Sequence, residues 1–412
     1  MKDWPPMSET TRLSAVDRVQ ELIPALIPEL VRIRRDIHAH PEVGHAEHRT
    51  TRLIVDTMAG AGLTPQVLTM GTGAMVDVVP EGWTPDDGLT GLRADIDALP
   101  IADAKDVPYA STVPDVCHAC GHDVHTAILL GAGMVLSRLR VEGRLTRGVR
   151  LIFQPAEEQS PGGATEAIAC GVLEHVTEAY AVHCDPRTDV GKIGIRVGAI
   201  TSACDRILIK LTGQGGHTSR PHLTGDLIGA LSALATQLPL VLSRRIDPRG
   251  GASLIWGRIR SGTAANAIPQ RGELEGTLRA MNLDGWEAAD RVMPELCRQV
   301  IAPYGVEMEL TISKGVPPTV NHPDGVDRMV DAADAMLGPG CVVDTEQSLG
   351  GEDFSWMLQQ VPGALARLGV RTRGRAATDI HQPTFNVDEQ CIPTGLKVMT
   401  GLAVSGVGPL DG

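Results

Sequence analysis

The sequence predicts an α/β protein: a first domain with a mostly parallel sheet and flanking helices, interrupted by a second, smaller inserted domain. Apolar strands alternate with apolar helices through the first part of the chain. Between about residues 191 and 313 the rhythm changes to β-α-β-β-α-β, the split βαβ or ferredoxin-like pattern. Acidic residues and histidines follow several of the predicted strands, which is where α/β sheets carry their chemistry.

The first domain opens with a helical pattern at residues 14–37. Pro24 and Pro28 interrupt this pattern, so we expect two helical pieces or a kink. The strands predicted after it lie at residues 74–79, 91–96, 149–153 and 179–182, and one buried helix is predicted at residues 126–139. After the inserted domain we expect a helix near residues 325–336 and then a loop-rich end.

The inserted domain has its own sequence of predicted elements. Two helices are expected at residues 226–243 and 285–301, and four strands at residues 204–212, 252–259, 272–279 and 306–313. We therefore divide the chain into a first segment of the main domain, the inserted domain and a second segment of the main domain, at residues 1–190, 191–314 and 315–412.

The composition indicates a folded protein with small partners. Of 412 residues, 42% are hydrophobic and 21% charged, which allows two domains with real cores. The net charge is -13 and basic residues form no run, which disfavours nucleic acid and anionic membranes as partners. We expect no apolar stretch near the roughly 20 residues that cross a bilayer, and no N-terminal signal, hence a cytoplasmic protein. Eight scattered cysteines predict packed, reduced thiols.

Residues 117–125 form the densest group of metal-binding side chains, two cysteines and three histidines ahead of an apolar helical pattern. Cys120 and His122 are alternate residues that would project to one side of an extended segment. Taken alone, the stretch fits a redox Cys-x-x-Cys, half of a structural zinc finger, or one arm of a catalytic metal centre. Those three interpretations remain open from these residues alone.

Two pairs of carboxylates follow predicted strands. Asp95 and Asp97 could orient a metal-bound histidine, although a salt bridge or a turn cap is the plainer explanation. Glu157 and Glu158 come directly after a buried strand, where adjacent carboxylates are costly unless a cation lies nearby. One of them could coordinate a metal while the other acts as a general base.

The remaining histidines are ambiguous one by one. His183 closes a predicted strand and His381 lies before a proline, and either could be an ordinary packed or surface residue. His38 and His40 are interpreted as structural hydrogen-bonding residues. His217 lies on a glycine-rich turn after a strand, from which it could reach a substrate carbonyl.

Asn266 and Arg279 are candidate substrate-binding residues of the inserted domain. Arg279 ends a predicted strand, and arginine binds a carboxylate with two parallel hydrogen bonds. Asn266 precedes Ala267-Ile268-Pro269 and could donate to the same group. Without context, a turn residue and a surface charge would explain them equally well.

Six ordered motifs resemble the aminoacylase/carboxypeptidase family of metallopeptidases, and more narrowly its amidohydrolase branch, which includes hippurate hydrolases, aminoacylases and auxin-conjugate hydrolases. The resemblance extends from about Arg34 to about Glu389. The motifs are Arg93-Ala94-Asp95-Ile96-Asp97-Ala98-Leu99-Pro100, His118-Ala119-Cys120-Gly121-His122-Asp123, Gln154-Pro155-Ala156-Glu157-Glu158, Gly215-Gly216-His217, Asn266-Ala267-Ile268-Pro269 and Gly351-Glu352-Asp353-Phe354.

This resemblance implies a two-metal centre in each subunit and assigns roles to its residues. Glu157 would be the general base, with Asp95 and His217 as further catalytic residues, and His217, Asn266 and Arg279 would bind the substrate. Cys117, His118 and His125 would have structural roles only. The implied metal ligands are Cys120, His122, Glu158, His183 and His381.

The resemblance also implies a function and partners. The expected activity is hydrolysis of the amide bond of N-acyl amino acids, with an exopeptidase or carboxypeptidase acting on short peptides as the alternative and a non-catalytic metabolite-binding protein as a weaker one. Zinc or manganese would fill the two sites, with cobalt or nickel as alternatives. The inserted domain would act as a lid and join two subunits, so that His217 completes the partner's active site.

Two positions depart from the pattern of other branches of this family. Arg93 stands where those branches carry a histidine, and Cys120 where they use a bridging carboxylate. Both differences are typical of the amidohydrolase branch, but they leave open whether both metal positions are filled.

Overall fold

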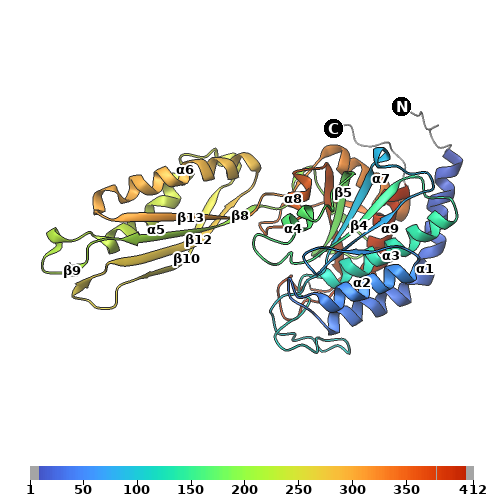
Figure 1. Ribbon diagram of the computed structural model, residues 1–412, viewed down its shortest axis with the longest axis horizontal. Helices are drawn as coiled ribbons and strands as arrows, with labels where there is room; N and C mark the ends of the chain where they lie inside the picture. Colours follow the sequence, from blue (N-terminus) through green and yellow to red (C-terminus); the bar gives the residue numbers. More distant parts are fainter. Residues whose placement is uncertain (1–8, 377, 405–412) are drawn as a thin grey trace. The chain divides into compact units, whose positions relative to one another are not determined.

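The chain divides into two compact units, each visible in Figure 1. Unit 1 comprises residues 1–200, 320–346 and 356–412, and unit 2 comprises residues 201–319 and 347–355. The computed structural model describes residues 9–376 and 378–404. Unit 2 is therefore chiefly one continuous insertion between two parts of unit 1.

Unit 1 is built on a large sheet. Its strands are β1 (Gln66–Val67), β2 (Ala74–Val78), β3 (Leu89–Asp95), β4 (Gly148–Gln154), β5 (Val176–Asp189), β6 (Ile193–Ile195), β15 (Val342–Asp344) and β16 (Gly363–Arg371). They pair in the order β1-β2-β4-β3-β5-β16-β6-β15. β3 is parallel to both β4 and β5, β5 is parallel to β16, and β6 is parallel to β15. The prediction of an α/β fold with a mostly parallel sheet is confirmed.

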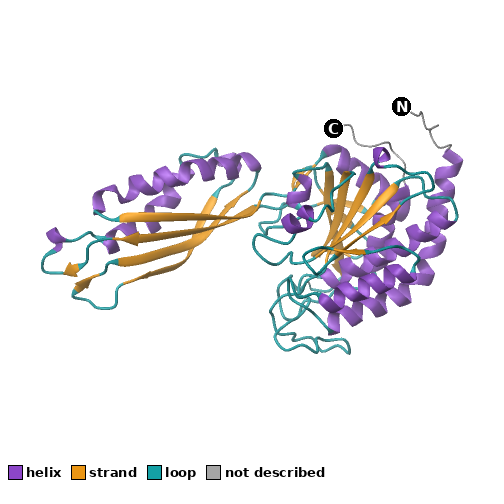
Figure 2. Ribbon diagram, in the orientation of Figure 1, coloured by secondary structure: helices purple, strands orange, loops and turns teal. Residues whose placement is uncertain are grey.

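The central strands of this sheet are covered on both faces. β3 and β4 are buried at every position, as expected for parallel strands between layers of helix. The covering helices, drawn in purple in Figure 2, are α1 (Glu9–Ala39), α2 (His48–Gly60), α3 (His122–Val141), α4 (Ala164–Ala169), α7 (Pro323–Leu337), α8 (Ser355–Leu358) and α9 (Cys391–Val404). A separate short ladder joins β7 (Gly198–Ala199) to β14 (Val320–Asn321).

Two expectations for unit 1 need correction. α1 is one continuous helix that contains Pro24 and Pro28, so the alternative of two helical pieces is wrong, whereas the alternative of a kink stays a prediction. It packs against α3 and α9 with buried side chains such as Ile23 and Leu30, and this packing outweighs the backbone hydrogen bonds that the prolines remove. The expected loop-rich end instead holds the central strand β16 and the helix α9, which is buried at every position except Pro393 and Lys397.

α3 also corrects the expectation that no stretch is long and apolar enough to cross a membrane. By length and composition alone, this 20-residue helix could cross a membrane, because an 18-residue stretch of it has a mean hydropathy of 1.3. However, 78% of that stretch is buried inside the protein, where α3 packs against α1 and α9. Such burial is typical of a core helix.

Unit 2 follows the predicted β-α-β-β-α-β order. Its main elements are β8 (Ala203–Thr212), α5 (Leu227–Ser243), β10 (Ser253–Ser261), β12 (Arg271–Ala280), α6 (Leu283–Ile301) and β13 (Glu307–Val316). The antiparallel sheet has the order β10-β12-β8-β13. A small ladder joins β9 (Gly216–His217) to β11 (Ala267–Ile268). Short 3-10 helices of the chain lie at Pro85–Asp87, Pro221–Leu223, Pro248–Gly250 and Ala302–Tyr304.

The helices α5 and α6 cover one face of the unit 2 sheet (Figure 1). Burial alternates along β8, where Ile207, Ile209 and Leu211 face the helices while Arg206 and Lys210 are exposed. This two-residue period is the signature of a sheet with one solvated face. Unit 2 thus has a hydrophobic core of its own, separate from that of unit 1.

Candidate metal centre

The five predicted ligands all belong to unit 1, but they come from four separate segments. His122 is the first residue of α3, and Cys120 lies two residues before it. His183 lies in β5, and Glu158 lies in the loop that follows β4. His381 lies between β16 and α9. Because β4 and β5 are parallel to β3, the segments at their carboxyl ends gather at one edge of the sheet.

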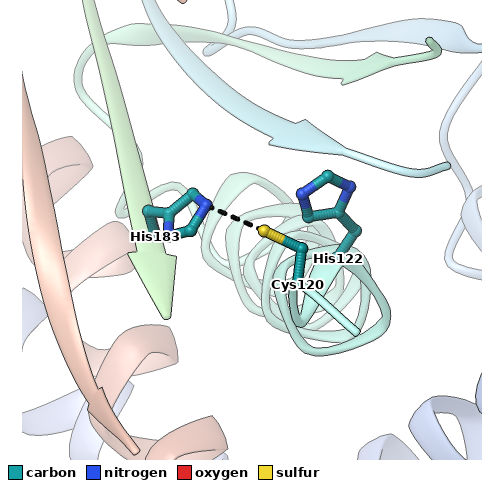
Figure 3. A group of neighbouring side chains, drawn as sticks. All are labelled: Cys120, His122 and His183. Carbon is teal, nitrogen blue, oxygen red and sulfur yellow. Dashed lines mark hydrogen bonds between the residues drawn. The ribbon is translucent and has the colours of Figure 1, made fainter. Parts of the chain in front are cut away.

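Three of these side chains form a buried group around the start of α3 (Figure 3). One ligand atom from each of Cys120, His122 and His183 lies within 4.8 Å of the others. The thiol Sγ of Cys120 is 3.4 Å from Nε2 of His183. Thiolate and imidazole are the ligands that zinc and similar ions prefer.

A second group shares Cys120 with the first. Ligand atoms of Cys120, Glu158 and His381 also lie within 4.8 Å of one another. Nε2 of His381 is 3.2 Å from Oε1 of Glu158, and the hydrogen bond to Glu158 raises the pKa of His381. The backbone N–H of His381 donates to the carbonyl oxygen of Ala119 at 2.7 Å, which ties this loop to the segment before α3. The five side chains therefore form two overlapping sets that share one thiol.

His122 is the clearest sign that this cluster fits a cation. Its Nδ1 lies 3.0 Å from the carbonyl oxygen and 3.2 Å from Oδ1 of Asp97, so Nε2 is the nitrogen that faces the cluster. Nε2 is buried without a hydrogen bond, with carboxylate oxygens of Asp95, Glu157 and Glu158 at 3.7 to 3.9 Å. Burial opposes a charge on this ring, but Asp95 and Asp97 raise the pKa of His122 to about 10. A shared cation would match this arrangement.

The environments of Cys120 and His183 shift the pKa of each side chain towards its neutral form. Nδ1 of His183 donates to the carbonyl oxygen of Cys184 at 2.9 Å, which leaves the lone pair on Nε2. Burial and the charge of Arg367 hold the pKa of His183 well below its usual range. Burial, followed by the negative charges of Glu158 and Glu157, raises the pKa of the Cys120 thiol well above its usual value. A bound cation would reverse that preference and stabilise the thiolate.

Asp97 links two of the candidate ligands. Besides its contact with Nδ1 of His122, its Oδ2 accepts the backbone N–H of Glu158 at 3.0 Å. Asp97 is almost completely buried. A carboxylate that holds the ring nitrogen remote from the cluster fixes both the tautomer and the orientation of the imidazole. These contacts are of the orienting kind that the sequence suggested for Asp95 or Asp97.

Asp95 acts through His125, which the sequence-based interpretation had set aside. Asp95 accepts hydrogen bonds from Nη1 of Arg93 and Nδ1 of His125, both at 2.6 Å. Nε2 of His125 in turn accepts the backbone N–H of Cys184, the residue after His183, at 2.9 Å. His125 therefore helps to place the part of β5 that carries His183. Its position three residues after His122, on the same face of the helix, was the signal in the sequence.

Glu157 lies beside the cluster, outside the two sets that contain Cys120. Its carboxylate also lies within 4.8 Å of ligand atoms of His122 and Glu158 and, in another group, of Glu352 and Asp353. Its side chain is 10% exposed, and Oε2 is 3.9 Å from Nε2 of His122. Glu157 and Glu158 follow Ala156, a non-glycine residue in the left-handed region with φ 58°. The adjacent carboxylates therefore leave the end of β4 through a sharp backbone turn, which brings both within reach of the same nitrogen.

Gly121 separates the two ligands at the start of α3. It adopts φ 91°, in the left-handed region that favours glycine. A Cβ atom at this position would lie 2.7 Å from Sγ of Cys184. Only a glycine therefore allows Cys120 and His122 to flank this turn while the end of β5 packs against it.

The other cysteine and histidine residues considered in the sequence lie outside the two sets of ligands. Cys117 is a buried free thiol whose backbone pairs with Leu99. His118 is buried, and desolvation lowers its pKa to about 3, so its ring is neutral. His38 contacts Oδ2 of Asp123 at 2.7 Å, and His40 contacts the carbonyl oxygen of Asp36 at 2.8 Å.

The remaining three candidates belong to unit 2. His217 in β9 is exposed and pairs with Ala267, and the N–H of Thr218 donates to the carbonyl oxygen of Asn266 at 3.2 Å. This ladder brings His217 and Asn266 together, shortly after the end of β8 at which Thr212 pairs with Arg271. Arg279 pairs with Cys204, eight residues from Thr212 and thus about 26 Å along β8, and its guanidinium donates to the carbonyl oxygen of Leu349.

A model of peptidase family M20/M25/M40 matches residues 91–405 of this chain. N-acetylcysteine deacetylase from Bacillus subtilis is 35% identical, with 91% of this chain and 96% of that protein aligned. Thermostable carboxypeptidase 2 from Saccharolobus solfataricus is 33% identical, with 95% and 99% aligned. A protein from Rhodococcus jostii named "Putative glutamate--cysteine ligase 2-3" is 45% identical over 91% of this chain, which spans only 46% of that longer protein.

The fold also matches a solved structure. The Bacillus subtilis protein YXEP, described as a dinuclear metal-binding peptidase of the M20 family, superposes with a TM-score of 0.80. The two sequences are 30% identical, and the match covers 93% of this chain and 98% of that one.

Proposed function

The chain belongs to peptidase family M20/M25/M40 and is a metal-dependent hydrolase of amide bonds, and we propose that it removes the acyl group from N-acyl amino acids. The observation that carries this proposal is the orphaned Nε2 of His122, buried among three carboxylates and within reach of Cys120 and His183. Such a cluster is suited to divalent ions and to the chemistry of an activated water.

The metal would be held by two sets of ligands that share a thiolate. Cys120, His122 and His183 form one set, and Cys120, Glu158 and His381 the other. We propose two divalent ions per subunit, zinc or manganese, with cobalt or nickel as alternatives. Bound ions of this kind lower the pKa of water and polarise a carbonyl oxygen.

Glu157 is proposed as the general base. It is the one of the two adjacent glutamates that is not among the five implied ligands, its side chain is 10% exposed, and its Oε2 lies 3.9 Å from Nε2 of His122. It would take the proton of the attacking water and return it to the departing amine nitrogen, as one carboxylate can do in both halves of an amide hydrolysis. Asp95 is proposed to support this site through His125 rather than by touching the substrate.

Unit 2 is proposed as a lid that also joins two subunits. His217 would donate a hydrogen bond to the developing oxyanion, and Asn266 and Arg279 would bind the amino-acid carboxylate. His217 and Asn266 lie at one end of the unit 2 sheet and Arg279 at the other, too far apart to hold one small substrate within a single protomer. A homodimer, or an oligomer built from such dimers, lets the two ends serve different active sites.

The proposed partners are a small N-acyl amino acid and a second copy of the chain, in the cytoplasm. The net charge of -13 disfavours nucleic acid and anionic membranes. All eight cysteines are free thiols, which suits a reducing compartment. N-acetylcysteine is a reasonable first substrate to try, because one similar protein is named for its deacetylation.

The main alternative is an exopeptidase or carboxypeptidase of the same family, which the similarity to a carboxypeptidase supports. Comparing an N-acetyl amino acid with a dipeptide of the same side chain separates the two activities. Faster hydrolysis of the dipeptide would favour the alternative. A non-catalytic metabolite-binding protein is a third candidate, which turnover of any member of a panel of acetyl, benzoyl, indoleacetyl and long-chain acyl amino acids would eliminate.

Glu157→Gln and Cys120→Ala test the assignment of roles. Glu157→Gln should retain metal and lose at least roughly 100-fold in turnover, because it removes the base but no ligand. Cys120→Ala should lower the metal-to-protein ratio, measured by elemental analysis after dialysis. Turnover near the wild-type rate in the first variant would remove Glu157 as the base, and an unchanged metal ratio in the second would remove Cys120 as a ligand.

A further inference from the structure

Glu47, at the start of α2, is buried beneath the loop that carries Glu157 and Glu158. Its side chain has no exposed surface. Oε1 of Glu47 accepts the backbone N–H of Ala156 at 2.8 Å, across 109 residues of sequence. Burial raises the pKa of this carboxyl group, as expected when a carboxylate leaves water. Burying an acidic group costs free energy of folding unless hydrogen bonds to the protein replace those to water.

Ala156 is the residue whose backbone turns the chain towards the cluster. It has φ 58°, a conformation that alanine rarely adopts. Its N–H is held by Glu47, and its carbonyl oxygen accepts the N–H of Gly163 at 2.8 Å. Both polar groups of the strained residue are therefore fixed, one by a distant side chain and one by the loop itself.

The backbone before Glu47 presses on the same loop. A Cβ atom on Gly44 would lie 2.7 Å from Cγ of Gln159 and 3.0 Å from Cα of Ala156. Since the second contact is with backbone, a larger residue at position 44 would have to displace the turn. Two independent features of residues 44–47 thus act on Ala156, a hydrogen bond and a close approach.

We propose that Glu47 is a positioning residue, which holds the N–H of Ala156 so that Glu157 and Glu158 leave β4 in the geometry that the metal centre needs. It touches neither the substrate nor the ligand atoms, and it acts through one residue of backbone. This inference rests on the proposed role of Glu157 as the base. Partners that orient active-site groups in this way commonly change metal affinity or activity by roughly 10- to 100-fold when they are removed.

Glu47→Ala, Glu47→Gln and Glu42→Ala form a matched set. Glu42 lies on the same segment, but its carboxylate caps α2 by accepting the N–H groups of Arg49 and Thr50 at 2.8 Å. At saturating metal, Glu47→Ala should lower kcat by roughly 10- to 100-fold with little change in KM. Glu47→Gln keeps an oxygen that can accept from Ala156 and should restore most of kcat. Glu42→Ala should lower the unfolding temperature but leave kcat unchanged.

Exchange of the Ala156 amide hydrogen with solvent gives a readout that does not depend on activity. Glu47→Ala should accelerate this exchange, whereas Glu42→Ala should not. If Glu47→Ala does not fold, Gly44→Ala displaces the same turn while keeping the carboxylate, and it should also lower kcat with KM little changed.

Three results would overturn the inference: wild-type kcat in folded Glu47→Ala, equal impairment of Glu47→Gln and Glu47→Ala, or unchanged Ala156 exchange in Glu47→Ala. Full activity of Glu157→Gln would instead contradict the proposed base. In that case faster Ala156 exchange in Glu47→Ala still supports the hydrogen bond as the element that holds the turn.

Discussion

The two sheets of this chain differ in where their charged side chains lie. In unit 1, Asp95, Asp97 and His122 are buried at the carboxyl end of the sheet, within a few ångströms of one another. In unit 2, charged side chains stand on the solvated face of the sheet, where Lys210 lies 4.0 Å from Glu309 and both side chains are exposed. Unit 2 also buries a charge, Asp205, but this side chain pairs with Lys314 at 3.1 Å instead of joining a cluster of acidic and histidine side chains.

This difference teaches which charges need an explanation. An exposed pair costs little and contributes little, so the charges of the unit 2 sheet are explained by solubility and pairing. Buried charges carry a desolvation penalty that pairing offsets only with good geometry. Their concentration at one edge of the unit 1 sheet is therefore evidence for a site, independent of any resemblance in sequence. Each of the following experiments tests this contrast.

Asp95→Asn should have the largest effect on stability. It removes the carboxylate charge from the buried ion pair between Asp95 and Arg93, and breaking a buried pair costs about 3 to 5 kcal/mol. Urea unfolding can be followed separately in each unit by labelling cysteines, with Cys184 and Cys391 reporting on unit 1 and Cys297 on unit 2. Labelling of Cys297 should be unchanged. A loss of stability below about 1 kcal/mol would mean that this buried charge behaves like a surface one.

Metal removal should destabilise unit 1 selectively. An ion at 100 times its dissociation constant stabilises the unit that binds it by about 2.7 kcal/mol, and chelation removes that contribution. Burial raises the pKa of Cys297 to about 12, so this thiol should react at neutral pH only after unit 2 opens. Chelation should therefore advance the labelling of Cys184 and Cys391 to lower urea and leave Cys297 unchanged. Equal shifts in both units would contradict a metal centre confined to unit 1.

Glu309→Gln should have the smallest effect. The side chains of Lys210 and Glu309 are 49% and 69% exposed, and pairs of this kind contribute less than about 1 kcal/mol. The urea midpoint for labelling Cys297 measures the change, with Asp95→Asn as the unit 1 counterpart. A change as large as that of the buried pair would erase the distinction between the two units.

The sequence predicted the regular parts of both units because their hydrophobic periods are clear. The alternation in β8 and the mostly apolar segment of β4 each identify a strand and its environment. The division of α1 into two pieces was expected because two prolines interrupt its pattern locally, whereas tertiary packing keeps the helix continuous. The strand β16 was missed because Arg367 and Arg371 interrupt its apolar residues and its partners β5 and β6 are distant in sequence.

Some residues of the candidate site can be recognised from their neighbours in the sequence, and others only from the fold. Cys120 and His122 are visible as a local cluster, but nothing nearby in the sequence joins them to His183 or His381. Only the resemblance to a known family suggested that connection, and the parallel sheet now brings the side chains into one place. His125 lies in the same local cluster, but its hydrogen bond to Cys184 spans the fold, and no motif pointed to Glu47, which acts through a hydrogen bond across 109 residues.

Gly121 contributes no donor atom to the centre, yet it determines the spacing of the donors on either side. The left-handed turn at this residue and the nearby Sγ of Cys184 leave room for a hydrogen atom only. A protein engineer who transplanted the five ligands to another scaffold without this turn would keep their chemistry and lose their arrangement. The arrangement of this centre thus depends partly on the absence of a side chain at one position of the main chain.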